Sequence, residues 1–398
     1  MGIGMLRGAS AAGLLTAGLL VTVGTAAPAA AATSWSVLST PNRGSIANEL
    51  YGSAALSATS AWAVGSWYDT NLAAPRTLIE RWNGTAWSTV TSPNATQYYN
   101  ELRDVDASSA TDAWAVGYAN GSSGVNGMPR TTLATHWNGT AWSTIATPQP
   151  GTNFRQLYAV KAFSAGNAWA VGWYYDSSLH GEGLVLHWNG SAWSQVTAPD
   201  PGTSGTTLEG VAGSGPNDVW AVGYYTNSGE HGVLGHPLAI HYDGTAWTET
   251  PMPESGSGTF LHSVAALSAN DVWAVGSKNG YSAPVAYHWN GSAWSEIPTP
   301  PTGGSGNNIL YGVAGVAPNQ VWAVGYASSS GQTQPIVQRW NGTAFTNETV
   351  PQQPIGGLLY SAAATTTGPT VFAAGTRWDL NGSGSIADRT LSMRGTGS

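Results

Sequence analysis

The sequence predicts an all-β fold built from a repeated unit of four short strands, and three observations lead to this prediction. A Trp-Ala-Val-Gly tetrad recurs at intervals of 49 to 55 residues, and about fifty residues accommodate four short strands with their turns. Seventeen of the 20 tryptophans fall in frame with the repeat. Charged residues make up only 9% of a chain that contains 52 glycines, a composition typical of turn-rich β proteins. The tetrads begin at Trp62, Trp114, Trp169, Trp220, Trp273, Trp322 and, in the variant Phe-Ala-Ala-Gly, at Phe372.

Each unit is expected to contain its four strands in the same order. In the sixth unit the first strand covers about residues 310–316 and the second about residues 321–325. A variable segment leads to a third strand, and an Asn-Gly or Asp-Gly turn, as in residues 82–87, leads to the fourth. These dipeptides tolerate the positive φ of tight hairpins. The fourth strand ends at a proline, as at Pro93 and Pro148; because proline lacks an N–H donor, this strand is expected at the outer edge.

The two ends of the repeat array complement each other. The seventh unit stops near Arg394, after its third strand, whereas residues 33–37 match a fourth strand such as residues 85–89. Pairing of the N-terminal segment with the last unit would close the ring and remove an exposed sheet edge. We therefore predict a seven-bladed β-propeller of four-stranded antiparallel blades over residues 33–398, closed by the N-terminal strand, which completes the last blade.

The repeat resembles sequences of a known kind. Val-Trp-Ala-Val-Gly, followed by a strand ending His-Trp-Asn-Gly-Thr-Ala-Trp-Ser and a terminal proline, resembles the tandem propeller repeats of secreted actinobacterial proteins. It is similar, more distantly, to kelch repeats such as those of the central domain of galactose oxidase, although one glycine stands where kelch repeats have two. The resemblance implies a propeller but no particular activity. The chain has no cysteine, which excludes the Tyr–Cys cofactor of galactose oxidase.

The first 32 residues have the pattern of a secretory signal peptide. Arg7 is their only charge, residues 11–23 are apolar, and residues 30–32 are three alanines suited to cleavage. We therefore expect a secreted, extracellular, monomeric protein with residues 33–398 as its mature domain. That domain carries 12 Lys and Arg against 21 Asp and Glu. Its negative charge disfavours nucleic acid and anionic membranes as partners.

The variable segments between second and third strands form the predicted recognition surface, because binding tends to reside in loops that vary on a repetitive scaffold. Several segments pair an aromatic residue with a carboxylate, a combination that binds sugars through ring contacts and hydrogen bonds. The alternative interpretation is that these aromatic side chains cap the edge of the core. The candidate ligand-binding residues are Trp67, Tyr68, Asp69, Trp173, Tyr174, Tyr175, Asp176, Tyr225 and Trp378.

A second candidate binding site is the mouth of the central channel. An Asn-Glu-Leu triplet occurs at residues 48–50 and again at residues 100–102, where the first strands of two neighbouring units begin. Arg155 lies near the start of the next unit. We predict that Glu49, Glu101 and Arg155 line the mouth. Residue spacing identifies no general acid–base pair, nucleophile with base, or phosphate-binding loop there.

Two loops contain candidate metal ligands. His231 and His236 share one long loop with Glu230, but their spacing matches no strict metal motif. Residues 379–386 match several positions of an EF-hand-type calcium loop, yet Thr390 stands where a bidentate acid belongs. A Gly/Ser turn that needs no ion is the alternative. The candidate calcium ligands are Asp379, Asn381, Ser383 and Asp388.

The sequence therefore favours a non-catalytic function. We expect a binding or scaffolding propeller that presents an aromatic-rich loop face to an extracellular protein or polymer such as a glycan, with no cofactor apart from the candidate calcium ion. Two alternatives remain, a lectin-like carbohydrate-binding module and a glycan-active hydrolase or lyase with site residues from several blades. An enzyme predicts a deep axial pocket with converging carboxylates, and a binding protein predicts shallow aromatic shelves.

Overall fold

The computed structural model confirms an all-β propeller fold. It describes residues 33–121, 129–230, 234–255, 258–303, 306–366 and 368–396, so the predicted signal segment 1–32 and His231 lie outside the described residues. The strands all lie within one compact unit, Ala31–Ser398. Within its described residues, no helix is long and apolar enough to cross a membrane.

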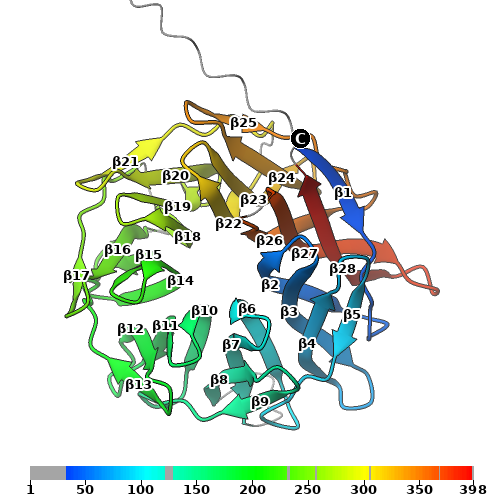
Figure 1. Cartoon of the computed structure of the whole chain (residues 1–398), viewed down its shortest axis with the longest axis horizontal. Coiled ribbons are helices and arrows are strands. Elements are labelled where there is room, and N and C mark those ends of the chain that lie inside the picture. The colour runs from blue at the N-terminus through cyan, green and yellow to red at the C-terminus, as the bar shows by residue number, and fades with distance from the viewer. Residues whose placement is uncertain are drawn as a thin grey trace, which may run out of the picture. The chain divides into compact units, whose positions relative to one another are not determined.

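Four strands succeed one another in each repeat unit, from the central axis outward (Figure 1). The innermost strands are β2 (Asn48–Ser57), β6 (Asn100–Ser109), β10 (Arg155–Ser164), β14 (Gly205–Gly215), β18 (Phe260–Ser268), β22 (Asn308–Ala317) and β26 (Gly357–Ala364). The second strands are β3 (Ser60–Asp69), β7 (Asp112–Asn120), β11 (Asn167–Tyr175), β15 (Asp218–Thr226), β19 (Asp271–Lys278), β23 (Gln320–Ser329) and β27 (Thr370–Leu380). The third strands are β4 (Ala74–Trp82), β8 (Arg130–Trp137), β12 (Gly181–Trp188), β16 (His236–Tyr242), β20 (Ala283–Trp289), β24 (Gln332–Trp340) and β28 (Ile386–Thr396). The outermost strands are β5 (Trp87–Val90), β9 (Trp142–Ile145), β13 (Trp193–Val196), β17 (Trp247–Glu249), β21 (Trp294–Ile297), β25 (Phe345–Asn347) and β1 (Ser34–Leu38).

The sheet pairing corrects the predicted number of separate blades. Five four-stranded antiparallel sheets form, not the seven that were predicted, because β10–β17 belong to one eight-stranded sheet. Within that sheet two repeat units keep the usual antiparallel order and are joined by a single parallel pair, Gly181 with Gly205. The two glycine backbones lie close together, and a Cβ on Gly181 would be 3.5 Å from Cα of Gly205. This contact comes from the backbone approach of two strands, which the spacing of the tetrads does not reveal.

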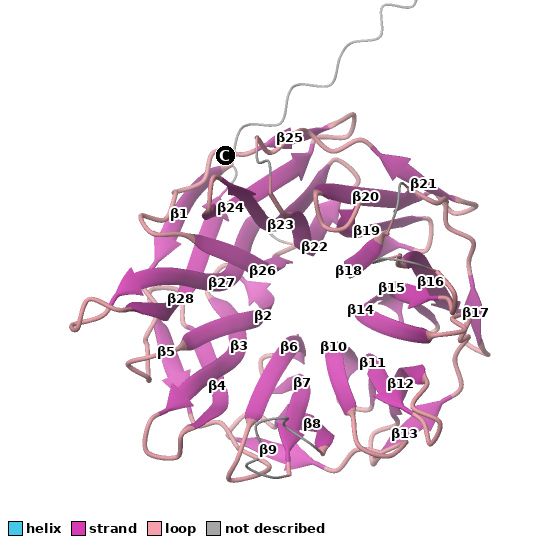
Figure 2. Cartoon of the chain, turned by 180° about the vertical axis from the view of Figure 1, so that it is seen from behind, coloured by secondary structure: helices cyan, strands magenta, loops and turns pink. Residues whose placement is uncertain are grey.

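The N-terminal strand completes the last sheet, as predicted. Strand β1 pairs antiparallel with β28, with Trp35 opposite Gly395 and Leu38 opposite Ser392. The order of this sheet is β1-β28-β27-β26, so β1 takes the outer position that β5 takes in the first unit (Figure 2). The two ends of the repeat array therefore share one sheet, and this pairing closes the ring.

Except at Trp322, the aromatic residue that begins each tetrad is buried against two aromatic rings of the following unit. The ring of Trp62 lies 5.2 Å from those of Trp137 and of Trp142, in edge-to-face geometry. Such contacts stabilise beyond the burial of apolar area alone. The same contacts join Trp114 to Trp188 and Trp193, Trp169 to Tyr242 and Trp247, Trp220 to Trp289 and Trp294, Trp273 to Trp340 and Phe345, and Phe372 to Trp82 and Trp87.

Trp322 meets a different partner, because the seventh unit has Arg394-Gly395 where the other third strands end in an aromatic residue. Here Trp35 of the N-terminal strand packs in the same core cluster as Trp322. Nε1 of Trp322 also donates a hydrogen bond to Oγ1 of Thr33 at 3.4 Å. The N-terminal segment thus supplies both a missing strand and a missing indole to the last junction between units.

One carboxyl group is buried in the core without a partner. Glu80 on β4 is 0% exposed, and neither of its carboxyl oxygens has a hydrogen-bond partner among the described residues. Burial raises the pKa of Glu80 to about 8, because an unpaired charge in the core is far costlier than a neutral carboxyl group. The side chain is therefore mainly protonated at neutral pH in the folded protein.

We expect Trp35→Ala to destabilise the protein by about 3–5 kcal/mol, the usual cost of truncating a buried tryptophan. Trp35 is 8% exposed, whereas Val37 on the same strand is 40% exposed, so Val37→Ala is the matched control and should change stability by less than about 0.5 kcal/mol. Urea unfolding followed by tryptophan fluorescence measures both changes. Equal effects of the two substitutions would contradict the assigned role of Trp35.

We expect Glu80→Gln to stabilise the protein increasingly as the pH rises from about 5 to about 8. In this window the folded state keeps the Glu80 proton and the unfolded state has lost it, so the wild type loses up to about 1.4 kcal/mol per pH unit relative to the variant. Urea unfolding at several pH values measures the difference. Glu249→Gln, at an exposed residue of β17, is the control and should show no such trend. A difference that does not depend on pH would argue against a neutral buried carboxyl group.

Candidate functional site: the axial channel

Every innermost strand contains a β-bulge at the same repeat position. In the first unit the pairing of β2 with β3 passes from Leu50 directly to Gly52, so Tyr51 is an extra residue without a partner. Bulges of this kind redirect a side chain, and each extra residue lines the central cavity. The seven extra residues, called the axial ring below, are Tyr51, Arg103, Tyr158, Glu209, His262, Tyr311 and Tyr360.

The glycine of each tetrad makes the bulge sterically possible. Gly65 pairs with Leu50, next to the bulge, and a Cβ on Gly65 would lie only 1.9 Å from the carbonyl oxygen of Glu49. Gly223 has the same relation to the carbonyl oxygen of Thr207, also at 1.9 Å. Any larger residue would push the two strands apart. The repeated glycine is therefore the sequence feature that fixes the position of the axial ring.

The axial ring differs from the rest of the repeat because its residues vary. The residue before the bulge is leucine in every unit, and it is fully buried, whereas the ring residue is Tyr, Arg, Glu or His. Residues that repeat in every unit are explained by equivalent packing. The ring residue is polar and differs between units although the backbone is the same, so packing does not explain it. The ring surrounds a cavity of about 380 Å³, within the range of ligand pockets.

One sector of the ring is built around an ion pair between a half-buried arginine and a buried glutamate. Nε of Arg103 lies 2.6 Å from Oε1 of Glu101, and the guanidinium lies 4.6 Å from the ring centre of Tyr51. The Tyr51 hydroxyl donates to Glu49, and the Tyr99 hydroxyl donates to Glu101 at 2.5 Å. Burial raises the pKa of the Glu49 carboxyl, and the negative charges of Asp388 and Glu101 raise it further.

Another sector contains a histidine held by a carboxylate. Nδ1 of His262 lies 2.6 Å from Oε2 of Glu209, and because a carboxylate only accepts hydrogen bonds, Nδ1 carries the proton. The imidazole is 9% exposed, and its Nε2 has no hydrogen-bond partner among the described residues. The ring of Tyr311 lies 4.9 Å from that of His262. This sector therefore presents an unpartnered ring nitrogen at the channel wall, which is an acceptor in the neutral imidazole.

Farther along the channel, two aspartates from β6 contact the backbone of β10. Asp104 accepts a hydrogen bond from the amide of Val160 at 2.9 Å, and burial raises its pKa to about 7. Asp106 accepts from the amide of Ala162 at 2.9 Å and pairs with Nζ of Lys161 at 2.8 Å. These carboxyl groups hold neighbouring inner strands together where their backbones are close.

The structure separates the three residues predicted at the channel mouth. Glu49 and Glu101 come close enough for the charge of Glu101 to raise the pKa of Glu49. Arg155, by contrast, occupies the repeat position of Asn48 and Asn100, one residue out of step with the glutamates. Its guanidinium donates to the carbonyl oxygens of Gln149 and Thr152 and so anchors a loop. The cation beside Glu101 is instead Arg103.

The predicted aromatic loop residues are partly buried and mostly contact other aromatic rings or the core. Trp173 stacks on Phe154 and contacts Tyr175 edge to face at 4.7 Å. It lies opposite Gln156, two residues before Tyr158 of the axial ring. Trp378 lies opposite Asp388 in the hairpin of β27 and β28, and the charge of Asp388 is one of those that raise the pKa of Glu49. These contacts place two of the predicted loop tryptophans beside the channel mouth. The residues that pack against core clusters are Trp67, Tyr174 and Tyr225.

The carboxylates predicted beside these aromatic residues have local roles. Oδ1 of Asp69 accepts from the amide of Asn71 at 2.9 Å, and Oδ1 of Asp176 accepts from the amides of Ser178 and His180 at 2.7 and 2.8 Å. Both aspartates thereby cap turns. Tyr68, the remaining loop candidate, donates its backbone amide to the carbonyl oxygen of Ala47 at 2.9 Å.

The candidate calcium ligands do not converge on one point. Asp388 lies opposite Trp378 and Asp379 lies opposite Ala387 in the hairpin of β27 and β28, so the two aspartates project from opposite faces of the sheet. Oδ1 of Asn381 accepts from the amide of Ser383 at 3.0 Å, and Asp379 pairs with Arg377 at 3.1 Å. The segment forms a tight hairpin turn stabilised by its own side chains.

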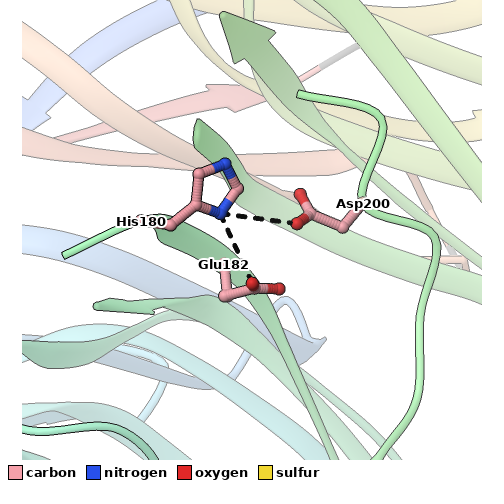
Figure 3. A group of neighbouring side chains, drawn as sticks. All are labelled: His180, Glu182 and Asp200. Atoms are coloured by element: carbon pink, nitrogen blue, oxygen red, sulfur yellow. Dashed lines mark hydrogen bonds and ion pairs between the residues drawn. The ribbon is translucent and has the colours of Figure 1, made fainter. Parts of the chain in front are cut away.

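Two further histidines contact pairs of carboxylates. His236 lies 2.9 Å from Glu254 and 3.0 Å from Glu230, and stacks on Tyr225. His180, Glu182 and Asp200 form a second cluster, which sequence reasoning missed, with Nδ1 of His180 3.3 Å from Glu182 and 3.8 Å from Asp200 (Figure 3). Nε2 of His180 lies 3.0 Å from the carbonyl oxygen of Gly202. The ion pairs and this contact with a carbonyl oxygen hold the side chains of the second cluster together.

Comparison with known proteins supports the fold. No protein-family model and no curated protein matches the sequence. Among solved structures, the chain is similar to YCF48 bound to D1 peptide, with 15% identity, a TM-score of 0.55, and coverage of 92% of this chain and 98% of the other. For YCF48 from Cyanidioschyzon merolae these values are 14%, 0.52, 90% and 98%.

A third similar structure is that of a polysaccharide lyase, the PL25 ulvan lyase bound to -[GlcA(1-4)Rha3S]-, with 10% identity, a TM-score of 0.51, and coverage of 91% of this chain and 94% of the other. At such low identities, the three similarities establish a shared fold and no shared chemistry. The chain therefore has a β-propeller fold.

Proposed function

We propose that this chain is a secreted, non-catalytic binding propeller that holds a segment of an extracellular protein or polymer at the mouth of its axial channel. The observation that carries the proposal is the axial ring, where varied polar residues replace the repeated residues of the surrounding framework. Aromatic loop residues such as Trp173, which lies opposite Gln156 near Tyr158, adjoin this ring. Rigid aromatic side chains provide large contact areas at low entropic cost, which favours a binding function.

The similar structures make a binding role on this fold reasonable. One holds a peptide and another holds a disaccharide unit of a polysaccharide. The present chain shares only their architecture, so its own residues must decide the ligand. The segment at residues 1–32 supports an extracellular site of action, because it has the charge and hydropathy pattern of a signal peptide.

Arrays of peptides and of glycans, probed with the full chain, test the proposal. We expect ligands that bind the wild type to bind Tyr360→Ala at least about thirtyfold more weakly, as is usual for a central aromatic contact. Trp67→Ala is the matched control, because Trp67 packs on the core and contacts Arg43, which is not a residue of the axial ring. Binding that Trp67→Ala abolishes and Tyr360→Ala leaves unchanged would place recognition in the loops, contrary to the proposal.

One observation favours a second function, that of a glycan-active lyase. The carboxylate of Glu209 keeps the proton of His262 on Nδ1, so Nε2 could accept a proton, and burial raises the pKa of the nearby Tyr311 hydroxyl. Such a pair could remove a proton beside a uronate carboxylate and protonate the leaving oxygen. The reaction would break a C–H and a C–O bond and form a C=C bond and an O–H bond.

Ultraviolet absorbance of unsaturated products, measured during incubation with uronate-containing polysaccharides, tests this second function. A lyase predicts product formation that His262→Ala abolishes, because the proposed base is removed. Glu249→Gln, remote on an outer strand, is the control and should keep the wild-type rate. Binding without any such product supports the non-catalytic function.

A further inference from the structure

The cations of the channel are already paired with carboxylates. Among the described residues, ion pairs join Arg103 to Glu101 and Lys161 to Asp106. Among these described residues, no lysine or arginine forms an ion pair with Glu49, Asp104 or Glu209. The channel therefore has an excess of carboxyl groups, and a ligand with a positive charge would complement it.

The hydrogen-bonding groups that remain unused also favour a donor. Among the described residues Nε2 of His262 has no partner, and it is an acceptor in the neutral imidazole, whose proton lies on Nδ1 toward Glu209. A carboxylate can accept several hydrogen bonds, so Glu209 keeps acceptor capacity beyond His262. An ammonium or guanidinium group carries only donors and matches this sector of the wall.

Tyrosines surround the same carboxylate. Burial raises the pKa values of Tyr158, Tyr224 and Tyr281, and the negative charge of Glu209 raises each of them further. The Tyr311 hydroxyl is affected in the same way. Tyrosine rings next to a carboxylate attract cations through both the ring face and the charge, so this sector offers a cation two kinds of favourable contact.

We infer that the axial channel binds a lysine or arginine side chain from an extended segment of a partner protein. The inference rests on the proposed binding function and names the ligand chemistry of the same site. A cavity of about 380 Å³ accommodates such a side chain. An anionic uronate is disfavoured by the channel carboxyl groups that no described lysine or arginine pairs. Arg130, the nearby cation, already contacts Tyr118, Phe154 and Gln156.

Fluorescence anisotropy with labelled peptides tests the inference on the full chain. The probes are Gly-Ser peptides of equal length that differ only at the central residue, which is lysine, arginine, glutamine or glutamate. We expect the lysine and arginine peptides to bind at least about tenfold more tightly than the glutamine peptide, and we expect added salt to weaken the binding of both basic peptides. Equal binding of all four peptides, or a preference for glutamate, would overturn the inference.

Two substitutions locate the contact. Glu209→Gln removes one carboxylate from the channel. We expect it to lower the affinity for the lysine peptide at least about thirtyfold, the usual effect of removing one partner of a buried charged contact. Glu49→Lys places a competing cation at the mouth and should also abolish the preference for lysine. Glu249→Gln removes the same charge from the exposed strand β17 and should leave binding unchanged. Circular dichroism and melting curves confirm that each variant is folded.

The outcomes separate this inference from the proposed function. Selective binding of basic peptides that Glu209→Gln and Glu49→Lys reduce supports both. Ring-dependent binding of a glycan or of neutral peptides, with no preference for lysine or arginine, supports the binding function and overturns the ligand assignment. Basic peptides that bind equally to the wild type and both channel variants would show a nonspecific charge effect and overturn the inference.

Discussion

The contact between one indole and the two aromatic rings of the next unit is the interaction on which the rest of this structure depends. Trp62, against Trp137 and Trp142, is one example of a contact that recurs around the ring. Because every unit both offers and receives rings, no unit can bury its core alone, and the array is stable only when it closes. At the closing junction Trp35 supplies the fourth-strand ring, and Gly395 stands opposite it where the other third strands have an aromatic residue.

This packing also determines how the channel is built. The tetrad that supplies the indole ends in a glycine, and the missing side chain of Gly65 lets the carbonyl of Glu49 approach its strand. The inner strand bulges there and presents one extra residue to the axis. The core motif and the axial ring are therefore mechanically linked, so the framework can keep its repeated residues while the ring residue varies from unit to unit.

Polar groups at the axis carry the chemistry that the apolar repeat lacks. Charged residues are only 9% of the chain, yet Arg103, Glu209 and His262 all face one cavity. Partial burial strengthens their interactions and raises pKa values such as that of Asp104, to about 7. The lysine and arginine side chains of the cavity already pair with carboxylates, while Glu209 and tyrosine rings also line it, and our inference of a cationic ligand rests on this imbalance.

The sequence by itself determined the all-β fold, the four strands of each unit and the closure by residues 33–37, because period, turn dipeptides and matching ends are local signals. Only the tertiary structure joined two units through Gly181 and Gly205 and thereby left five separate blades. Reasoning from sequence placed Glu49 and Glu101 near the mouth, but Arg155 aligns with Asn48 and Asn100, because Arg155-Gln156-Leu157 takes the place of the Asn-Glu-Leu triplet before the bulge. It also missed the axial ring, although a varied polar residue after each repeated leucine was a usable signal. The direction of that side chain depends on an unpaired residue between two strands, and strand pairing exists only in the folded chain.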